Sequence, residues 1–178
     1  MSDRHGENPP EDRPDSFSEV ERRIEVTRRR LRGYPQDQVR LARLIIHVQK
    51  RQNELTNQVL RRHGLNYVTY TALMMMYGAE DQATTPSELS SATGEKPANI
   101  TRICDELLEQ GLIERNPSTE DRRRVVLRLT RRGERLVEQV QPELWQRLER
   151  SFGGFSGSEM RQLTGLLRTV LARMDQDA

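Results

Sequence analysis

The residues best suited to chemistry in this sequence are arginines gathered at 122–135. That segment holds seven arginines and one acid, Glu134. A guanidinium group binds phosphate and guanine through paired hydrogen bonds, so the cluster favours a polyanionic partner. The alternative is a solvated, arginine-rich loop. Only Lys50 and Lys96 are lysines among the 29 basic residues, and a coding bias would explain that preference but not the clustering. The seven are Arg122, Arg123, Arg124, Arg128, Arg131, Arg132 and Arg135.

A second polar group lies on a predicted helix at 96–110. At about 100° per residue, its apolar residues share one face, which must pack on a core. Asn and Arg make two-pronged contacts to adenine and guanine, and Thr reaches a base or a thymine methyl. A helix entering a major groove by its N-terminus would present these donors and keep its later carboxylates away from phosphates; the alternative is an ordinary solvated face. The outward residues of its first two turns are Lys96, Asn99, Thr101 and Arg102, followed by Asp105, Glu106 and Glu109.

The elements around that helix must position these side chains. Thr85 is a predicted N-cap, with Pro86 in the first turn and Glu88 completing a capping box. A tight turn at 92–95 leads into the helix at 96–110. Strands at 112–115 and 124–130 then flank a polar turn. Helix, turn, helix and hairpin together predict a winged helix-turn-helix.

The rest of the chain is predicted to be helical, so the fold class is mainly α with a small β-hairpin wing (α+β). Apolar residues make up 34% of the chain, and its 11 glycines bring the total to about 40%, below the usual 45–50%. This favours disorder in part of the chain, completion of the core in an oligomer, or both. Further helices are expected from Ser16 to Leu31 and at 36–63, 67–78, 131–150 and 158–174. The expected organisation is a disordered tail at 1–15, an N-terminal helical extension at 16–34, a dimerisation helix at 35–66, the winged helix-turn-helix at 67–130, and C-terminal dimerisation helices at 131–178.

Composition excludes several other classes. Charged residues are 31% of the chain, and no apolar run approaches the roughly 18–20 residues of a membrane span. The N-terminus has no apolar core typical of a signal peptide, so we expect a cytoplasmic protein. A single cysteine excludes an internal disulfide and a cysteine metal cluster. The scattered histidines, His5, His47 and His63, match no catalytic or metal spacing, so neither an enzyme nor a cofactor is expected.

Two smaller sites are open to interpretation. Tyr70 and Met74, with Met75 and Met76 and with His47 on the preceding helix, suggest a lipophilic pocket, because flexible thioethers suit varied ligands. The alternative is that the methionines are plain core. Cys104 could be a redox switch, but it faces the core of the motif, where a thiol usually stays protonated and inert.

The sequence also carries a family resemblance. Asp121-Arg122-Arg123 and Leu129-Thr130-Arg131-Arg132-Gly133 resemble the D-x-R … L-T-x-x-G wing pattern of the MarR family of bacterial regulators. The segments at 86–89, 99–102 and 108–115 are similar to its motif helices and first strand. The resemblance covers roughly 35–175, and the segment from Glu21 through His47 resembles the EmrR/MprA branch.

The resemblance implies a homodimer, built from the first and last helices, that represses multidrug efflux genes from a pseudo-palindromic operator. Small phenolic or lipophilic effectors would bind between the dimerisation and DNA-binding lobes. DNA contacts would come from Asn99, Thr101, Arg102 and Arg123, with Ser87 on a phosphate and Asp121 holding Arg123. A winged-helix module whose basic wing meets an acidic protein is the alternative.

Overall fold

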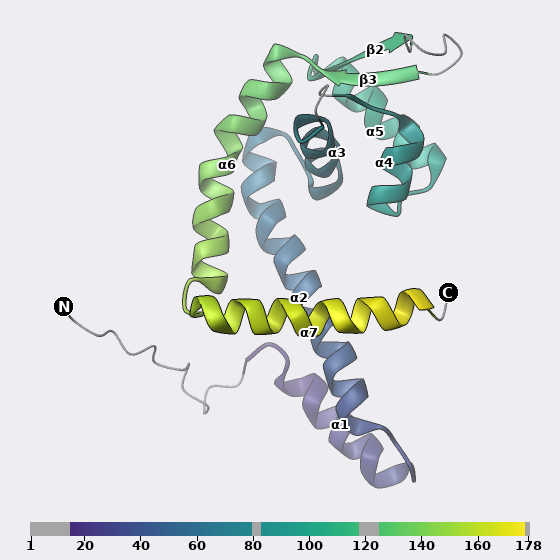
Figure 1. Ribbon diagram of the computed structural model, residues 1–178, viewed down its shortest axis with the longest axis vertical. Coiled ribbons are helices and arrows are strands. Elements are labelled where there is room, and N and C mark those ends of the chain that lie inside the picture. The colour runs from purple at the N-terminus through teal and green to yellow at the C-terminus, as the bar shows by residue number, and fades with distance from the viewer. Residues whose placement is uncertain (1–14, 80–82, 118–124, 177–178) are drawn as a thin grey trace, which may run out of the picture. The chain divides into compact units, whose positions relative to one another are not determined.

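The computed structural model describes residues 15–79, 83–117 and 125–176 (Figure 1). The chain divides into two compact units, described separately below: the described residues up to His47 together with those from Gln146 onward, and residues Val48–Trp145. The elements in chain order are α1 (Ser18–Arg30), α2 (Gln36–Leu60), the 3-10 turn η1 (Arg61–His63), α3 (Tyr67–Tyr77), β1 (Ala83–Thr84), α4 (Pro86–Thr93), α5 (Pro97–Glu109), β2 (Ile113–Pro117), β3 (Val125–Leu129), α6 (Arg131–Phe152) and α7 (Gly157–Gln176).

The Val48–Trp145 unit contains a closed hydrophobic core. Side chains from α3, α4, α5, the sheet and the adjoining parts of α2 and α6 meet in one cluster. The sheet is antiparallel with strand order β1-β3-β2, and Thr84 lies opposite Leu127 while Ile113 lies opposite Leu129. Side chains that are almost completely buried include Leu60, Leu73, Met76, Leu89, Ile100, Ile103, Leu107, Leu127, Val137 and Val140.

The junction of wing and α6 explains the L-T-x-x-G pattern. The Leu112 carbonyl accepts hydrogen bonds from the Thr130 amide and hydroxyl, at 3.1 and 3.2 Å. The Thr130 hydroxyl in turn accepts from the Gly133 amide at 3.1 Å and so caps α6. A Cβ at Gly133 would overlap the Leu112 carbonyl oxygen. Glycine is therefore required there by close approach.

The other unit packs α1 against the first half of α2. Phe17 and Ile24 are buried beneath α1, the Arg40 side chain lies 3.6 Å from the Glu21 carboxylate, and Gln36 donates to Glu25 at 3.1 Å. The turn between the two helices contains Gly33 at φ 77°, a conformation that favours glycine. The predicted N-terminal helical extension is thus a helix packed on α2.

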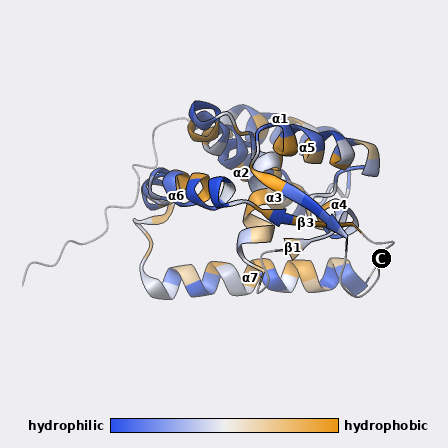
Figure 2. Cartoon of the chain, turned by 90° about the horizontal axis from the view of Figure 1, so that it is seen from above, coloured by the Kyte–Doolittle hydropathy of each residue, from blue (hydrophilic) through white to orange (hydrophobic). Residues whose placement is uncertain are grey.

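Helix α7 has no buried residue. Apolar residues recur along it at spacings of three and four, which places them on one face of the helix, and Figure 2 colours their segments of the ribbon orange. We call Leu163, Leu166, Leu167, Val170, Leu171 and Met174 the α7 stripe. All of them except the half-buried Val170 are exposed, Leu166 and Met174 by about three-fifths of their surface.

The predicted elements are confirmed, with two differences. The helix expected at 36–63 ends as α-helix at Leu60, because the Leu65 amide returns to the Leu60 carbonyl and Gly64 takes a left-handed φ of 71°. Strand β1, not predicted, pairs with β3. Two residues are too few to show a strand alternation in the sequence. The tail expected at 1–15 lies outside the described residues except for Asp15.

Candidate nucleic-acid interface

Helix α4 begins with a complete capping box. Glu88 donates its amide to the Thr85 hydroxyl at 3.3 Å, and its carboxylate accepts from the Thr85 amide at 2.7 Å. The same carboxylate accepts from the Thr84 hydroxyl of β1 at 2.9 Å. Ser87, the predicted phosphate contact, is exposed in the first turn. The first turn of α4 is therefore fixed both to itself and to the sheet.

A short connection sets α5 against α4. Gly94 has a φ of 69° and ends α4, and Ser90 donates its hydroxyl to the Glu95 carbonyl at 2.7 Å. Lys96, the N-cap residue of α5, is exposed. The inward face of α5 buries Ile100, Ile103 and Leu107, as predicted. The two helices thus form a helix-turn-helix with the polar face of α5 outward.

The predicted base-contacting residues form a hydrogen-bonded chain on α5. Asn99 donates its amide to the Glu95 carboxylate at 2.5 Å and accepts from Arg102 Nε at 3.1 Å. Arg102 also lies 3.4 Å from the Glu106 carboxylate, with its side chain 65% exposed. Thr101 is exposed and donates its hydroxyl to the Pro97 carbonyl at 3.1 Å. Asn99 and Arg102 therefore hold each other between two acids.

The sequence did not predict that Glu95 would accept a hydrogen bond from Asn99 or that Glu106 would pair with Arg102. Glu106 was expected at the far end of the helix, away from phosphates, yet it lies one turn from Arg102. Asn99, Arg102 and Glu106 follow one another at i,i+3 and i,i+4 and so face each other on α5, whereas Glu95 precedes the N-cap Lys96. That spacing is the signal that could have found the pair of Arg102 and Glu106.

The arginines at 122–135 divide into three groups, of which the first is Arg128 alone, half-buried in β3. Arg122, Arg123 and Arg124, with Asp121, lie outside the described residues. The guanidinium-bearing residues at the start of α6 are exposed, and none of them forms an ion pair with a described residue. They are Arg131, Arg132 and Arg135.

The predicted pocket residues fall into both units. Gln141 Nε2 lies 3.1 Å from the Tyr70 hydroxyl and 2.8 Å from Met74 Sδ, and burial raises the pKa of Tyr70. Met76 is fully buried core. His47 belongs to the other unit, where its Nε2 lies 2.7 Å from the Ser16 hydroxyl and Phe17 packs edge-on against its ring. Gln141 was not predicted, because an isolated glutamine carries no pattern.

Cys104 lies in the core between α5 and the sheet. Only 1% of its surface is exposed. Burial raises the pKa of its thiol, an effect that the nearby Arg115 partly opposes. Because the thiolate is the reactive form, this position disfavours oxidation.

Two other kinds of site are absent from the described residues. None of the helices they form is long and apolar enough to cross a membrane. Among these same residues, no group of three or more His, Cys, Asp or Glu side chains could hold a metal ion.

Comparison with known proteins places this geometry in a family. The sequence model of the MarR family matches residues 63–124. The transcriptional repressor MprA of Escherichia coli strain K12 is 35% identical over 161 residues, which cover 90% of this chain and 92% of MprA.

Solved structures agree with the sequence comparison. Apo wild-type MarR from E. coli has 29% identity and a TM-score of 0.61, with 74% of this chain and 96% of MarR covered. A cysteine-to-serine mutant of MarR, complexed with operator DNA, has 26% identity and a TM-score of 0.64 over 89% of this chain and 99% of its own. The shared fold is the winged helix-turn-helix.

Proposed function

Because this chain belongs to the MarR family of transcriptional regulators, we propose that it is a dimeric repressor that binds a pseudo-palindromic operator and is released by small lipophilic or phenolic effectors. Its resemblance to the MprA branch supports multidrug efflux genes as its targets. We also propose a cytoplasmic location, where its DNA target would lie. The observation that carries the proposal is the outward face of α5, where Asn99, Thr101 and Arg102 lie in the first turns of a recognition helix.

The arrangement on α5 suits groove binding. The N-terminus of the helix carries the positive end of its dipole, and Lys96 adds a full charge there. Exposed Ser87 in the first turn of α4 can donate to a phosphate on the flank of the same groove. The MarR mutant solved with operator DNA has the same fold and 26% identity, which supports a DNA ligand for this chain as well.

The α7 stripe supports a homodimer. Monomeric proteins rarely leave large contiguous apolar patches in water, and leucines spaced along one helix can pair with a second copy of that helix. Dimerisation would hold two recognition helices about 34 Å apart, one turn of DNA.

We also propose an effector site at Tyr70 and Met74, and, separately, an effect of His47 on effector release. Gln141, which already binds the Tyr70 hydroxyl, would be displaced or shared by a phenolic ligand. The His47→Ala change should weaken the release of DNA by such a ligand. If release were unchanged, His47 would have no part in it.

The proposal is tested with an operator duplex enriched from a random DNA library on the full chain. Fluorescence anisotropy measures the affinity, which should fall steeply with salt. A plot of the logarithm of the association constant against the logarithm of the salt concentration should have a slope of about −0.9 for each phosphate neutralised. Arg102→Ala should relax base preference at one position in each half-site at a cost of about 1–3 kcal/mol, whereas Arg123→Ala should weaken all sequences more evenly.

A matched control is Arg61→Ala, which removes an exposed arginine from η1. Its affinity for the duplex should stay at the wild-type value. Indifference of DNA affinity to both Arg102→Ala and Arg123→Ala would contradict the proposal and favour the protein-binding module. Abolition of DNA binding by mild peroxide, prevented by Cys104→Ser, would instead indicate a redox regulator.

A further inference from the structure

The polar face of α5 is held by a residue that lies before the helix begins. Glu95 stands between Gly94, which ends α4, and Lys96, the N-cap of α5. Its carbonyl accepts from the Ser90 hydroxyl at 2.7 Å, and its amide donates to the Thr93 hydroxyl at 3.3 Å. The backbone of Glu95 is therefore fixed to α4 by both of its polar groups, and the side chain projects from a fixed point.

The Asn99 side-chain amide has one orientation that bonds to both of its neighbours. Its Nδ2 donates to the Glu95 carboxylate at 2.5 Å, and its Oδ1 accepts from Arg102 Nε at 3.1 Å. An ionised carboxylate only accepts hydrogen bonds and a guanidinium only donates them, so an amide turned the other way would lose both. The amide can rotate toward an adenine only by giving up these bonds. Asn99 thus links Glu95 to Arg102.

Arg102 is the member of this link that can reach a base. Its side chain is 65% exposed, whereas Glu95 and Asn99 are half-buried. Arginine pairs with guanine through two nitrogens that donate to O6 and N7, and Asn99 occupies only Nε. Nη2 has no hydrogen bond with another described residue. Nη1 lies 3.4 Å from the Glu106 carboxylate, longer than the usual separation of about 2.7–2.9 Å in a charged hydrogen bond.

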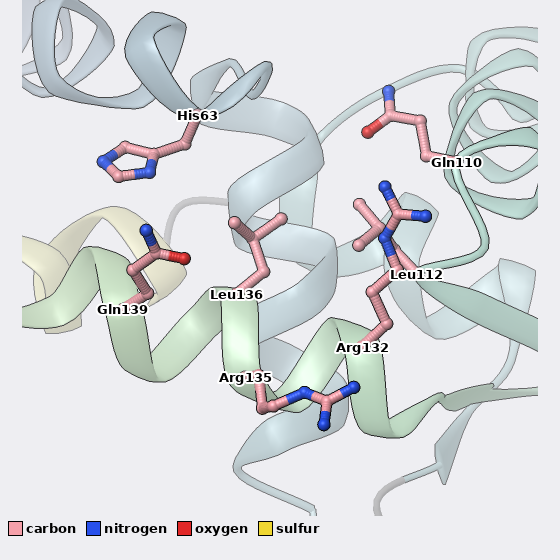
Figure 3. Close-up of a pocket in the computed structure, with 7 residues that line it drawn as sticks. All are labelled: His63, Gln110, Leu112, Arg132, Arg135, Leu136 and Gln139. Carbon is pink, nitrogen blue, oxygen red and sulfur yellow. The ribbon is translucent and has the colours of Figure 1, made fainter.

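The far end of α5 lacks such a link. The Gln110 side chain lines a cavity of about 410 Å³, which His63, Arg132 and Arg135 also line (Figure 3), and it forms no side-chain hydrogen bond with another described residue. In Figure 3 the two guanidinium groups point apart, so they form no joint site for an anion. Hydrogen bonding between polar side chains is therefore not general along this helix, and its presence at 95–102 needs a cause.

We propose that Glu95 is a specificity-determining residue, which positions Arg102 through Asn99 so that the guanidinium meets a guanine in each half-site of the operator. The inference rests on the proposed function and deepens it, because it assigns base reading to Arg102 and a positioning role to Asn99. A free arginine side chain has many rotamers, and one that is already placed loses less entropy on binding. A carboxylate near phosphates lowers affinity for all DNA, so its gain lies in the choice of base.

The first measurement is the base preference of two Glu95 variants, on the enriched operator duplex and on duplexes with each base pair of the half-site replaced in turn. Glu95→Ala and Glu95→Gln remove the same charge, but the glutamine carbonyl can still accept from Asn99. Glu95→Ala should lower the preference for guanine, at the position that Arg102→Ala identifies, about three- to tenfold, the usual effect of one lost hydrogen bond. Glu95→Gln should restore it to within about twofold of the wild-type value.

Two further variants separate charge and direct base reading from positioning. Glu109→Ala removes an exposed acid at the far end of α5 and should leave the base preference unchanged. Asn99→Ala should lower the preference at the same base pair as Arg102→Ala, and N99A/R102A should lower it no further than R102A alone. A loss at a different base pair in N99A would make Asn99 a base reader and overturn the proposal. Equal base preference in E95A and E95Q would also overturn it.

A measurement without DNA distinguishes failure of this inference from failure of the proposed function. NMR relaxation of the Arg102 Nε–H group in the free chain should show order that falls in Glu95→Ala and persists in Glu95→Gln and Glu109→Ala, with circular dichroism confirming that each variant is folded. Unchanged order in Glu95→Ala would overturn the positioning role even in a chain that binds its operator. A wild-type chain that binds no duplex would overturn the proposed function and the guanine assignment, whatever the order of Arg102.

Discussion

The two units of this chain differ in how much of their apolar surface is buried. The Val48–Trp145 unit encloses its leucines and isoleucines among the sheet, α3, α4, α5 and the adjoining parts of α2 and α6, and many are below 2% exposed. In the other unit, α1 covers part of α2, but the α7 stripe stays exposed or half-buried. The first unit carries the proposed DNA contacts, and the second leaves an apolar surface that suits another copy of itself.

This contrast indicates where rigidity and where association are built. A closed core holds a recognition helix in one geometry. An exposed apolar face that a partner covers would couple the stability of that region to assembly. The predictions below test this division.

The largest effect is expected from charges in the α7 stripe. The double change L167E/L171E removes two leucines, each worth about 1.5–3 kcal/mol when buried, and places carboxylates in the proposed interface. The dimer dissociation constant should rise at least about 100-fold by sedimentation equilibrium. Ala172→Glu, on the opposite side of α7, should leave it unchanged. A wild-type chain that is monomeric at micromolar concentration would contradict the dimer outright.

The next largest effect is expected from a substitution in the core of the Val48–Trp145 unit, which should lower the stability of that unit. In Gly133→Ala the new Cβ meets the Leu112 carbonyl and the Leu129 side chain, so the free energy of unfolding should fall by about 1–3 kcal/mol, the usual cost of overpacking. Gly165→Ala on α7 meets nothing within 4 Å and should gain about 0.5–1 kcal/mol. Urea denaturation of both variants measures the difference, and equal effects would erase the contrast between the units.

A smaller effect is expected on α5. Glu106→Gln removes the acidic partner of Arg102 Nη1 and leaves that nitrogen available to a base, and an exposed i,i+4 ion pair is worth about 0.3–0.5 kcal/mol. Operator affinity should rise about twofold. Glu109→Gln removes the same charge from the same helix without touching Arg102, and should give a smaller rise. If both changes gave the same increase, only long-range charge would be involved.

The smallest effect concerns acid stability of α1. Hydrogen bonds from Arg22 and Arg23 lower the pKa of Glu19 to about 2, and Arg28 does the same for Glu25. A lowered pKa in the folded state stabilises α1 above the ordinary value of 4.5, and this contribution is lost as the pH falls toward 2. Carboxylate NMR titration should show that R22A/R23A moves the pKa of Glu19 toward 4.5 and leaves Glu25 near 2. An unchanged Glu19 would contradict this.

The sequence predicted those elements whose determinants are local. Thr85 and Glu88 identify the start of α4, and Ile100 with Leu107 shows which face of α5 is buried. What it did not predict depends on contacts between distant residues. Gln141 meets Tyr70 across 71 positions, and β1 exists because Ala83 finds Arg128. Arg132 and Arg135 were recognised as basic, but their cavity with His63 and Gln110 arises only from tertiary packing.

The Glu88 carboxylate fixes the length of the chain between the sheet and α4. It accepts from the Thr84 hydroxyl and from the Thr85 amide at once, while Thr84 keeps its register opposite Leu127. One residue inserted between Thr84 and Glu88 would turn Glu88 by about 100° around the axis of α4 and separate its carboxylate from one of its donors. A single deletion would have the same effect. We therefore expect insertions and deletions at positions 84–88 to destabilise the protein, whereas substitutions of several side chains there should not lower its stability.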